Sequence, residues 1–404
     1  MKTIYFANHA QFEGRYTNLG DWAIFEQMIG ELAPLIKNKR CRVVVASAEP
    51  KFTRRHYPVI AFQRGGLRGI WSTLKWLCKS DLIVIGGGEI VQDLSSMVYI
   101  PYQLIRPFIG KLFGKKLFAY AIGIGEEWEI SWLGKLQAKI VLDLFDIITV
   151  RDRKSYRVLT EYLGVKKPDI FLTADPALNL KKSQCADFYD RPYAVMSVRS
   201  VYHRTRNLLP FSIRKKLGLV PAEYYKEIEI FKQSMAGIAS EIIDKYGWNI
   251  VFLNTYTGKS MSANDDKFSM DVINKIPQKY REKVSVIGRN FFPRQIKAIL
   301  GKAELILSVP LHPLILGASE GVPLISFAYA SKSSCFMEDI GMKQYTHRVV
   351  KIGERVEIDK VMEQADVIIN NHKQICDDLS EQVDSLCQME KKNIVLLKNL
   401  LEIV

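Results

Sequence analysis

The sequence predicts an α/β protein built from two Rossmann-like domains, with a helical C-terminal tail. Short apolar runs alternate with longer amphipathic stretches over the first 180 residues, and a second alternation of the same kind begins at Tyr193. Such alternation is typical of doubly wound parallel sheets. At 404 residues the chain is also too long for a single ordinary hydrophobic core. We therefore expect two domains that face each other across a cleft.

In the first half, strands are expected at short apolar runs, and helices where apolar residues recur every three to four positions. The predicted strands are residues 3–7, 42–46, 82–85, 116–121, 147–150 and 169–172. The predicted helices are residues 23–35, 67–78, 105–112 and 132–144. We assign residues 1–185 to this first domain, because the polar stretch 181–191 resembles an interdomain link.

The second half follows the same two patterns. Its predicted strands are residues 193–198, 249–253, 284–287, 305–308 and 323–327. Its predicted helices are residues 222–245, 270–276, 292–301 and 312–320. We assign residues 190–350 to the second domain and residues 351–404 to the helical tail, which is amphipathic in places.

The charge balance bears on partners. The net charge is +14, from 57 Lys and Arg against 43 Asp and Glu residues, and it favours an anionic partner. The basic residues are dispersed, with no long tract and no recognisable nucleic-acid module, so we expect no nucleic-acid partner. An anionic membrane surface and acidic small molecules rank first.

Cysteine usage and apolar runs bear on location. The six cysteines lie far apart and include no CxxC pair, which argues against a zinc site and a disulfide framework. The N-terminus reads as a strand and not as a signal peptide. No apolar run approaches the ~18 residues that a membrane-spanning helix needs. We expect a cytoplasmic protein.

A triple glycine marks the most informative segment, residues 81–93, which read DLIVIGGGEIVQD. Four apolar residues indicate a strand buried on both faces. The glycines at its carboxyl end either let a ligand approach the backbone, at the sheet edge where ligands bind in open α/β sheets, or form a tight turn that binds no ligand. The turn and the polar residues after it are Gly86, Gly87, Gly88, Glu89, Gln92 and Asp93.

Three further polar groups follow or precede predicted elements of the first half. Asn18, Gly20 and Asp21 precede the first helix, where they form either an anion site or a plain N-cap. Arg151 follows a strand and either faces the cleft or pairs with Asp152 at the surface. Asp175, held extended by the proline after it, either points into the cleft or orders the turn.

In the second half, three cationic residues follow strands. Arg199 can bind a carboxylate or phosphate bidentately, or form an ordinary salt bridge. His312 starts a helix, next to its N–H donors, and can act as acid, base or phosphate ligand, or be structural. Lys332 reaches the same cleft or is an ordinary surface lysine.

Taken in order, these segments resemble the polysaccharide pyruvyl transferase family. The matching pieces span residues 18 to 332 and are Asn18-Leu19-Gly20-Asp21, Gly86-Gly87-Gly88 with Gln92-Asp93, Gly123-Ile124-Gly125, Val150-Arg151-Asp152 with Ser155, Thr173-Ala174-Asp175-Pro176-Ala177, Ser197-Val198-Arg199, and Leu311-His312 with Gly321-Val322-Pro323 and Tyr329 to Lys332.

The resemblance implies a fold like that of the two-domain GT-B glycosyltransferases. It implies transfer of a pyruvyl group from phosphoenolpyruvate to two hydroxyls of one sugar, which forms a cyclic ketal and releases phosphate. The sugar belongs to a cell-surface polysaccharide, such as an exopolysaccharide or capsule, or to its lipid-linked precursor. The resemblance implies no metal and no organic cofactor.

The resemblance also implies site roles, with the donor bound by the second half and the acceptor by the first. The donor-binding residues are Arg199, Leu311, His312 and Lys332. The acceptor-binding residues are Asn18, Gly20, Gly86, Gly87, Gly88, Glu89, Gln92 and Asp175. We expect His312 to act as general acid or to assist the departing phosphate, and Asp93 to act as base, with Asp21 or Glu89 as alternatives to Asp93.

One position departs from the family. The family usually has an arginine directly before its Leu-His pair, where this chain has Pro310. Loss of that donor contact costs ~1.5–3 kcal/mol if nothing replaces it. Arg289, Arg294 and Lys332 are the possible replacements.

Two other functions remain open at this point. The first is a nucleotide-sugar glycosyltransferase of the same architecture, for which Glu320 is the evident candidate as acidic ribose ligand. The second is a non-catalytic glycan-binding member of the family. Separately, residues 66–79, 106–116 and 207–217 mix Lys and Arg with Trp, Phe, Leu and Ile, as interfacial helices do. They are either ordinary packed helices or peripheral contacts with the inner face of an anionic membrane.

Overall fold

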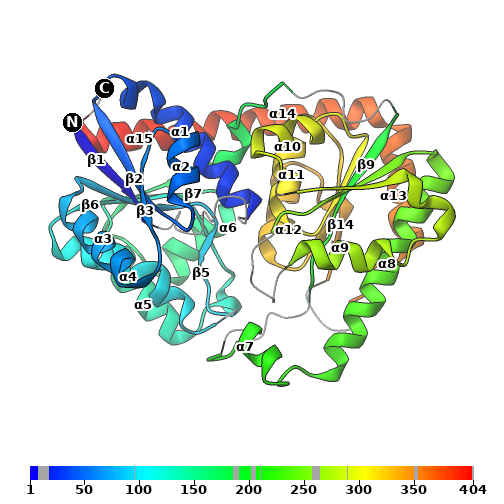
Figure 1. Cartoon of the computed structure of the whole chain (residues 1–404), viewed down its shortest axis with the longest axis horizontal. Coiled ribbons are helices and arrows are strands. Elements are labelled where there is room, and N and C mark those ends of the chain that lie inside the picture. The colour runs from blue at the N-terminus through cyan, green and yellow to red at the C-terminus, as the bar shows by residue number, and fades with distance from the viewer. Residues whose placement is uncertain are drawn as a thin grey trace. The chain divides into compact units, whose positions relative to one another are not determined.

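The computed structural model describes residues 1–7, 18–94, 96–184, 191–201, 206–209, 211–256, 264–288, 290–349 and 354–402. The chain divides into two compact units (Figure 1). Unit 1 comprises Met1–Leu180, Arg206–Leu208 and Leu386–Val404, and unit 2 comprises Lys181–Thr205 and Leu209–Ser385. Each unit contains one parallel sheet, and the chain ends in helices, which confirms the predicted fold class.

The sheet of unit 1 has the strand order β3-β2-β1-β4-β6-β7-β8, with β5 paired to β6. Its strands are β1 (Lys2–Phe6), β2 (Cys41–Ser47), β3 (Ile60–Gln63), β4 (Leu82–Gly86), β5 (Glu89–Val91), β6 (Lys116–Ile124), β7 (Ile147–Val150) and β8 (Asp169–Leu172). All pairs are parallel. All five residues of β4 are buried, as expected for an apolar strand covered on both faces.

The strand order of unit 1 reverses between β1 and β4, which are neighbours in the sheet. Right-handed crossovers therefore place the helices that follow β1 and β2 on one face, and the helices that follow β3, β4 and β6 on the other. Figure 1 shows α1 (Leu19–Lys37) and α2 (Pro50–His56) on one side, and α3 (Gly66–Lys79), α4 (Tyr99–Leu112) and α5 (Trp132–Leu142) on the other. A reversal of this kind opens a crevice at the carboxyl ends of the two strands.

Shorter elements complete unit 1. They are the 3₁₀ helices η3 (Glu127–Glu129) and η5 (Pro176–Asn179), α6 (Arg153–Arg157) and the π-helical turn η4 (Val158–Tyr162). The last helix, α15 (Lys392–Leu401), packs against β6, and Lys116 Nζ donates to the Leu400 carbonyl at 2.9 Å.

The sheet of unit 2 has the order β11-β10-β9-β12-β13-β14 and is parallel throughout. Its strands are β9 (Tyr193–Ser197), β10 (Asn249–Leu253), β11 (Val284–Ile287), β12 (Leu305–Ser308), β13 (Leu324–Ala328) and β14 (Thr346–Arg348). Here the order reverses between β9 and β12, so their carboxyl ends form the switch point of this unit.

Helices connect the strands of unit 2 and lead out of it. They are α7 (Phe211–Lys216), α8 (Ala222–Tyr246), α9 (Asp265–Ile273), α10 (Pro293–Leu300), α11 (Leu311–Ala318), α12 (Ser331–Asp339), α13 (Ile358–Asn370) and α14 (His372–Glu390), with the 3₁₀ helices η6 (Gln278–Lys283) and η7 (Lys343–Tyr345). In the described ranges, none of the helices is both long and apolar enough to span a bilayer.

The expected strands are all confirmed, with ends that shift by at most three residues. The strands that the sequence did not predict, β3, β5 and β14, have three or four residues each, too few for an alternation pattern. Three helices begin at least four residues earlier than predicted. α1 starts at Leu19 because the Asn18 side chain caps it, accepting from Gly20 N at 3.2 Å. α4 starts at Tyr99 because Pro101 fits the first turn, where its missing N–H costs nothing. α9 starts at Asp265 because the Asn264 side chain caps it, accepting from Lys267 N at 3.2 Å.

Candidate functional site

The glycine turn lies at the switch point of unit 1, directly after β4. Gly87 and Gly88 have φ of 69° and 94°, in the left-handed region that disfavours residues with a Cβ. Gly86 allows close packing, because a Cβ there would lie 2.5 Å from the Tyr120 carbonyl oxygen. The turn therefore depends on glycine at all three positions, and it leaves the backbone of this edge uncovered by side chains of its own.

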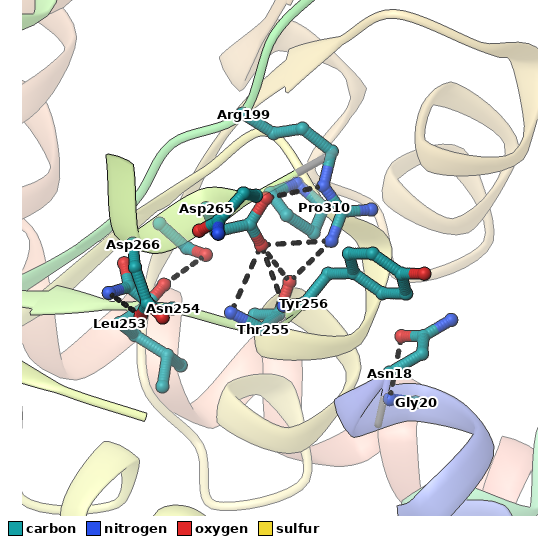
Figure 2. A network of polar contacts seen from close by, with 12 residues as sticks. Asn18, Gly20, Arg199, Leu253, Asn254, Thr255, Tyr256, Asp265, Asp266 and Pro310 are labelled. Atoms are coloured by element: carbon teal, nitrogen blue, oxygen red, sulfur yellow. Dashed lines mark hydrogen bonds and ion pairs between the residues drawn. The ribbon is translucent and has the colours of Figure 1, made fainter. Parts of the chain in front are cut away.

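The start of α1 adjoins that turn. Asn18 Oδ1 accepts from Gly20 N at 3.2 Å, so Asn18 is an N-cap, as one of the two interpretations predicted (Figure 2). Its amide nitrogen donates to Asp21 Oδ2 at 3.3 Å. Asp21 Oδ1 lies 3.6 Å from the point where a Cβ on Gly88 would be. The structure thus brings Asn18, Gly20, Asp21 and Gly88 together, with the half-buried Asp21 carboxylate facing the turn.

A buried arginine occupies the next strand ends. The Arg151 side chain is only 4% exposed, and its Nη1 lies 2.9 Å from Asp175 Oδ2. Its Nε lies 3.7 Å from Asp152 Oδ2, so the expected surface pair with Asp152 is instead part of a buried cluster. Burial alone would lower the pKa of Arg151, but the carboxylates of Asp175, Asp152 and Glu89 outweigh it and raise that pKa. Glu89 therefore shares the electrostatic environment of Arg151.

The end of β6 is shaped to receive Arg151. The register between β6 and β7 shifts between Ala119 and Ile122, and Ala121 between them has a φ of 47°. Such an irregularity re-aims the end of a strand. Gly123 follows it, and a Cβ on Gly123 would lie 2.9 Å from Arg151 Nη2. Glycine at this position leaves the space in which the guanidinium lies.

Two predicted site carboxylates are engaged by the protein itself. Asp175 Oδ1 accepts from Ala177 N at 3.0 Å and Oδ2 pairs with Arg151, so Asp175 orders its turn. Asp93 is 1% exposed and accepts from Ser131 N at 3.0 Å, from the Ser131 hydroxyl and from Arg206 Nε at 3.1 Å. Ser131 is the N-cap of α5, so Asp93 fixes the start of that helix. A carboxylate that is buried and held in this way must break a hydrogen bond before it can accept a proton.

Gln92 is also buried, at 5% exposure, and its Cβ lies 3.0 Å from the point where a Cβ on Gly125 would be. The part of the glycine-turn segment that is open to a ligand is therefore Gly87, Gly88 and Glu89, which are half-buried.

The site of unit 2 centres on Arg199, two residues after β9. Arg199 Nε and Nη2 donate to Asp265 Oδ1 and Oδ2 at 3.0 and 2.9 Å, a bidentate pair (Figure 2). Nη2 also donates to Thr255 Oγ1 at 2.9 Å. Burial alone would lower the pKa of Arg199, but the Asp265 carboxylate outweighs it and raises that pKa. The predicted salt bridge of Arg199 is present, but it is largely buried: the side chains of Arg199 and Asp265 are 15% and 1% exposed.

Aromatic rings link Arg199 to a second cation. Arg199 Cζ lies 5.8 Å from the centre of the Tyr256 ring, and Tyr329 also contributes to the raised pKa of Arg199. Lys332 Nζ lies 5.5 Å from the centre of the Tyr329 ring. Lys332 is thus half-buried beside a tyrosine that interacts with Arg199, and not a remote surface lysine.

The helix that starts with the Leu-His pair begins on the neighbouring strand. Ser308 of β12 is paired with Ser197 of β9, and Val309 N donates to the Ser197 carbonyl at 2.9 Å. Pro310 is the N-cap of α11 and lies beside the Arg199–Asp265 pair in Figure 2. His312, the second residue of α11, is half-buried. Leu311 is 4% exposed, so its contribution to an anion site is its backbone N–H.

Sequence reasoning missed three residues that hold Arg199, namely Asp265, Thr255 and Tyr256. Asp265 accepts from Thr255 N, Thr255 Oγ1 and Tyr256 N, at 3.1, 2.9 and 2.8 Å. The sequence does mark Asp265 as part of a capped helix start, because Asn264 is followed by an acidic first turn. Nothing in that pattern points to Arg199, which is 66 residues away from Asp265. Of the possible substitutes for the family arginine, Arg289 lies outside the described residues and Arg294 is exposed. Over the described ranges, no three His, Cys, Asp or Glu side chains gather as metal ligands would.

The order and spacing of these segments correspond to a known family model. The model for polysaccharide pyruvyl transferases matches residues 18–331, which include both the glycine turn and the Arg199 cluster. The chain belongs to the polysaccharide pyruvyl transferase family. The search of curated proteins found no match to the sequence of this chain.

Solved structures with a similar fold include sugar-nucleotide enzymes of the GT-B type. The MnaA–UDP complex of S. aureus has a TM-score of 0.63 at 12% identity, over 100% of this chain and 98% of that chain. A glycosyltransferase from Rickettsia africae has a TM-score of 0.59 at 11% identity, over 99% and 98%. The UDP-GlcNAc 2-epimerase of Neisseria meningitidis has a TM-score of 0.58 at 11% identity, over the whole of both chains. At identities this low, the similarity establishes the fold of this chain and nothing further.

Proposed function

We propose that this protein transfers a pyruvyl group from phosphoenolpyruvate to two hydroxyls of one sugar in polysaccharide biosynthesis. The observation that carries the proposal is the family match over residues 18–331, which includes Arg199, an arginine that Asp265 holds in a fixed orientation at a sheet switch point. Membership of the family supports a transferase, and the donor and the ketal product are the specific content of the proposal.

The donor carries a carboxylate and a phosphate, and unit 2 supplies cations for both. Asp265 and Thr255 bind Arg199 through Nε and Nη2, and Tyr329 also forms a hydrogen bond with its side chain. We therefore assign the Nη1 side of the guanidinium, next to Tyr329, to the donor. Lys332, held over Tyr329, supplies the second positive charge where the family arginine is replaced by Pro310. The N–H groups at the start of α11 add partial positive charge at the same strand ends.

Besides anion binding, the reaction moves two protons: each acceptor hydroxyl gives up one, and the methylene carbon and the departing phosphate each take one up. One acceptor hydroxyl adds to the central carbon of phosphoenolpyruvate while the methylene carbon takes up a proton. The second hydroxyl then displaces phosphate from that carbon, and its proton leaves with the phosphate. We assign delivery of the methylene proton, or assistance to the departing phosphate, to His312. We assign the base on the sugar side to Asp21, because its carboxylate is half-buried beside the glycine turn, whereas Asp93 is 1% exposed and binds Ser131 and Arg206.

The acceptor is proposed to bind unit 1, where Gly87 and Gly88 expose backbone and Asn18, Asp21 and Glu89 supply polar groups. Hydroxyls of a sugar suit carboxylate and amide partners of this kind. Because two hydroxyls must reach one carbon, orientation of the sugar contributes most of the rate. We propose that the sugar belongs to a polysaccharide or to its lipid-linked precursor.

The test is phosphate release from phosphoenolpyruvate in the presence of candidate lipid-linked sugars. We expect Arg199→Lys to retain charge but lose the bidentate geometry, and to reduce kcat/KM by about 10–100-fold, chiefly through KM for the donor. We expect His312→Gln to reduce kcat by about 100-fold or more. Arg191→Gln and His372→Gln, which change the same residue types away from the two clusters, serve as controls. Wild-type rates in both site variants would remove these assignments, and nucleotide consumption would indicate a glycosyltransferase.

A further inference from the structure

Three neighbouring helices of unit 1 carry an unusual concentration of exposed apolar side chains. Helices α3, α4 and α5 lie on the same side of the sheet, and α4 contacts both of the others (Figure 1). Twelve of the 25 exposed large apolar side chains in the described ranges lie between residues 67 and 140. Nine of them are on these helices and form what we call the docking face: Leu67, Ile70, Trp71, Tyr102, Ile105, Leu112, Trp132, Leu136 and Ile140.

The spacing of these residues places them on the outward stripe of each helix. Leu67, Ile70 and Trp71 are three and four positions apart in α3, and Trp132, Leu136 and Ile140 are four apart in α5. Side chains at such spacing project from one side of a helix. Their exposure ranges from 42% to 77%, so the docking face is open over its whole extent.

The charge of the same helices has one sign. They contain seven Lys and Arg residues and no Asp or Glu, in a protein with 43 acidic residues. Lys111 and Lys139 pair with Asp146 and Asp143 beyond the ends of α4 and α5, at 3.5 and 3.1 Å. The other basic residues are Arg68, Lys75, Lys79, Arg106 and Lys135.

We propose that the docking face adsorbs to an anionic phospholipid bilayer. Tryptophan, tyrosine and aliphatic side chains enter the boundary between headgroups and acyl chains, while Lys and Arg extend to the phosphates. A second copy of the chain is the poorer occupant, because two faces that carry only positive charge repel each other. Nucleic acid is also poorer, because exposed Leu and Ile gain nothing from a phosphate backbone.

Adsorption would hold unit 1 at a membrane that carries lipid-linked sugar, which favours such a precursor over free polysaccharide as the acceptor. That consequence rests on the proposed function, but the docking face does not, since vesicle binding needs neither donor nor acceptor. If the protein binds vesicles but releases no phosphate, the docking face stands and the proposed pyruvyl transfer does not. If it releases phosphate but does not bind vesicles, the pyruvyl transfer stands and the docking face does not.

The experiment is flotation of the full chain with phosphatidylcholine vesicles, with and without about 30% phosphatidylglycerol. We expect binding to the anionic vesicles only, weakened by high salt, with a blue shift of tryptophan fluorescence as Trp71 and Trp132 leave water. Arg68→Gln with Lys75→Gln removes two charges and should weaken binding by about 30-fold, at roughly fivefold for each basic residue. Trp71→Ser with Trp132→Ser should abolish the fluorescence shift and weaken binding.

The matched control is Lys226→Gln with Lys373→Gln, which removes two exposed charges from α8 and α14 of unit 2. It should bind anionic vesicles like the wild type. Because every replaced side chain is at least partly exposed, circular dichroism and Tm should be unchanged in all variants. The proposal is overturned by no binding to anionic vesicles, by equal loss in variants and control, or by a dimer in solution that Trp71→Ser dissociates.

Discussion

Replacing Asp265 by alanine leaves the Arg199 guanidinium buried without its carboxylate. The side chain of Asp265 is 1% exposed and that of Arg199 is 15% exposed, so water replaces little of what is lost. Asp265 also accepts from Thr255 N and Tyr256 N, at 3.1 and 2.8 Å. Breaking a buried ion pair from one side costs about 3–5 kcal/mol. For a unit of this size, that loss lowers Tm by roughly 6–20 °C.

The matched control is Asp266→Ala, one residue further along α9. Asp266 is half-buried and accepts from Asn254 Nδ2 at 2.8 Å, so its loss should cost only about 1 kcal/mol. Asp265→Asn keeps the size of the side chain and should fall between the two. Urea unfolding measures the three free energies, and donor KM in the phosphate-release assay reports the orientation of Arg199. Equal stability of Asp265→Ala and Asp266→Ala, with unchanged KM, would refute the idea that Asp265 positions Arg199.

Two further predictions concern unit 1. Gly123→Ala places a Cβ 2.9 Å from Arg151 Nη2, and Asp175 holds the same guanidinium through Nη1, so thermal unfolding should show a loss of about 1–3 kcal/mol. Gly30→Ala, with no atom within 4 Å of its Cβ apart from those of its chain neighbours and of the helix backbone, should stabilise α1 by up to about 1 kcal/mol. Equal effects of the two changes would contradict the close contact at Gly123. Burial, reinforced by the carboxylates of Glu31 and Asp175, raises the pKa of Glu390 from 4.5 to about 7. A raised carboxyl pKa means that the folded state holds the proton more tightly, so the stability it contributes is present below pH 4.5 and is lost as pH rises through 7. Glu390→Gln removes this dependence on pH. Its free energy of unfolding should exceed that of the wild type by a margin that grows between pH 4.5 and 7 and reaches up to about 3 kcal/mol. Urea unfolding at several pH values measures the margin, and a margin that does not change with pH would contradict the prediction.

The fold was predictable because apolar runs and helical spacing specify it locally. The run 82–85 is long and uniformly apolar, so its burial on both faces follows from the sequence. The short edge strands β3 and β14 depend on pairing with β2 and β13, which no local pattern reveals. The early start of α9 depends on one capping side chain, that of Asn264.

The site was predictable only where one segment supplies the whole arrangement. The glycine turn and the Asn18 cap are local features, and both appear in the structure as expected. The hydrogen-bond partners of Arg199 are 56 or more residues away along the chain, and those of Asp93 are 38 or more residues away. The sequence therefore indicated an arginine and a carboxylate but not what binds them. The contact of Asp93 with Ser131, which no local pattern reveals, is what separates Asp93 from Asp21 as a candidate base.

The central claim is that pyruvate moves from phosphoenolpyruvate into a ketal on one sugar. The most direct measurement uses phosphoenolpyruvate labelled with carbon-13 at its central carbon, followed by NMR and mass spectrometry of the lipid-linked acceptor. The account predicts a ketal carbon in the product, formed in equal amount to the phosphate released, and neither of them with Arg199→Ala. Release of phosphate with free labelled pyruvate and an unchanged acceptor would contradict it.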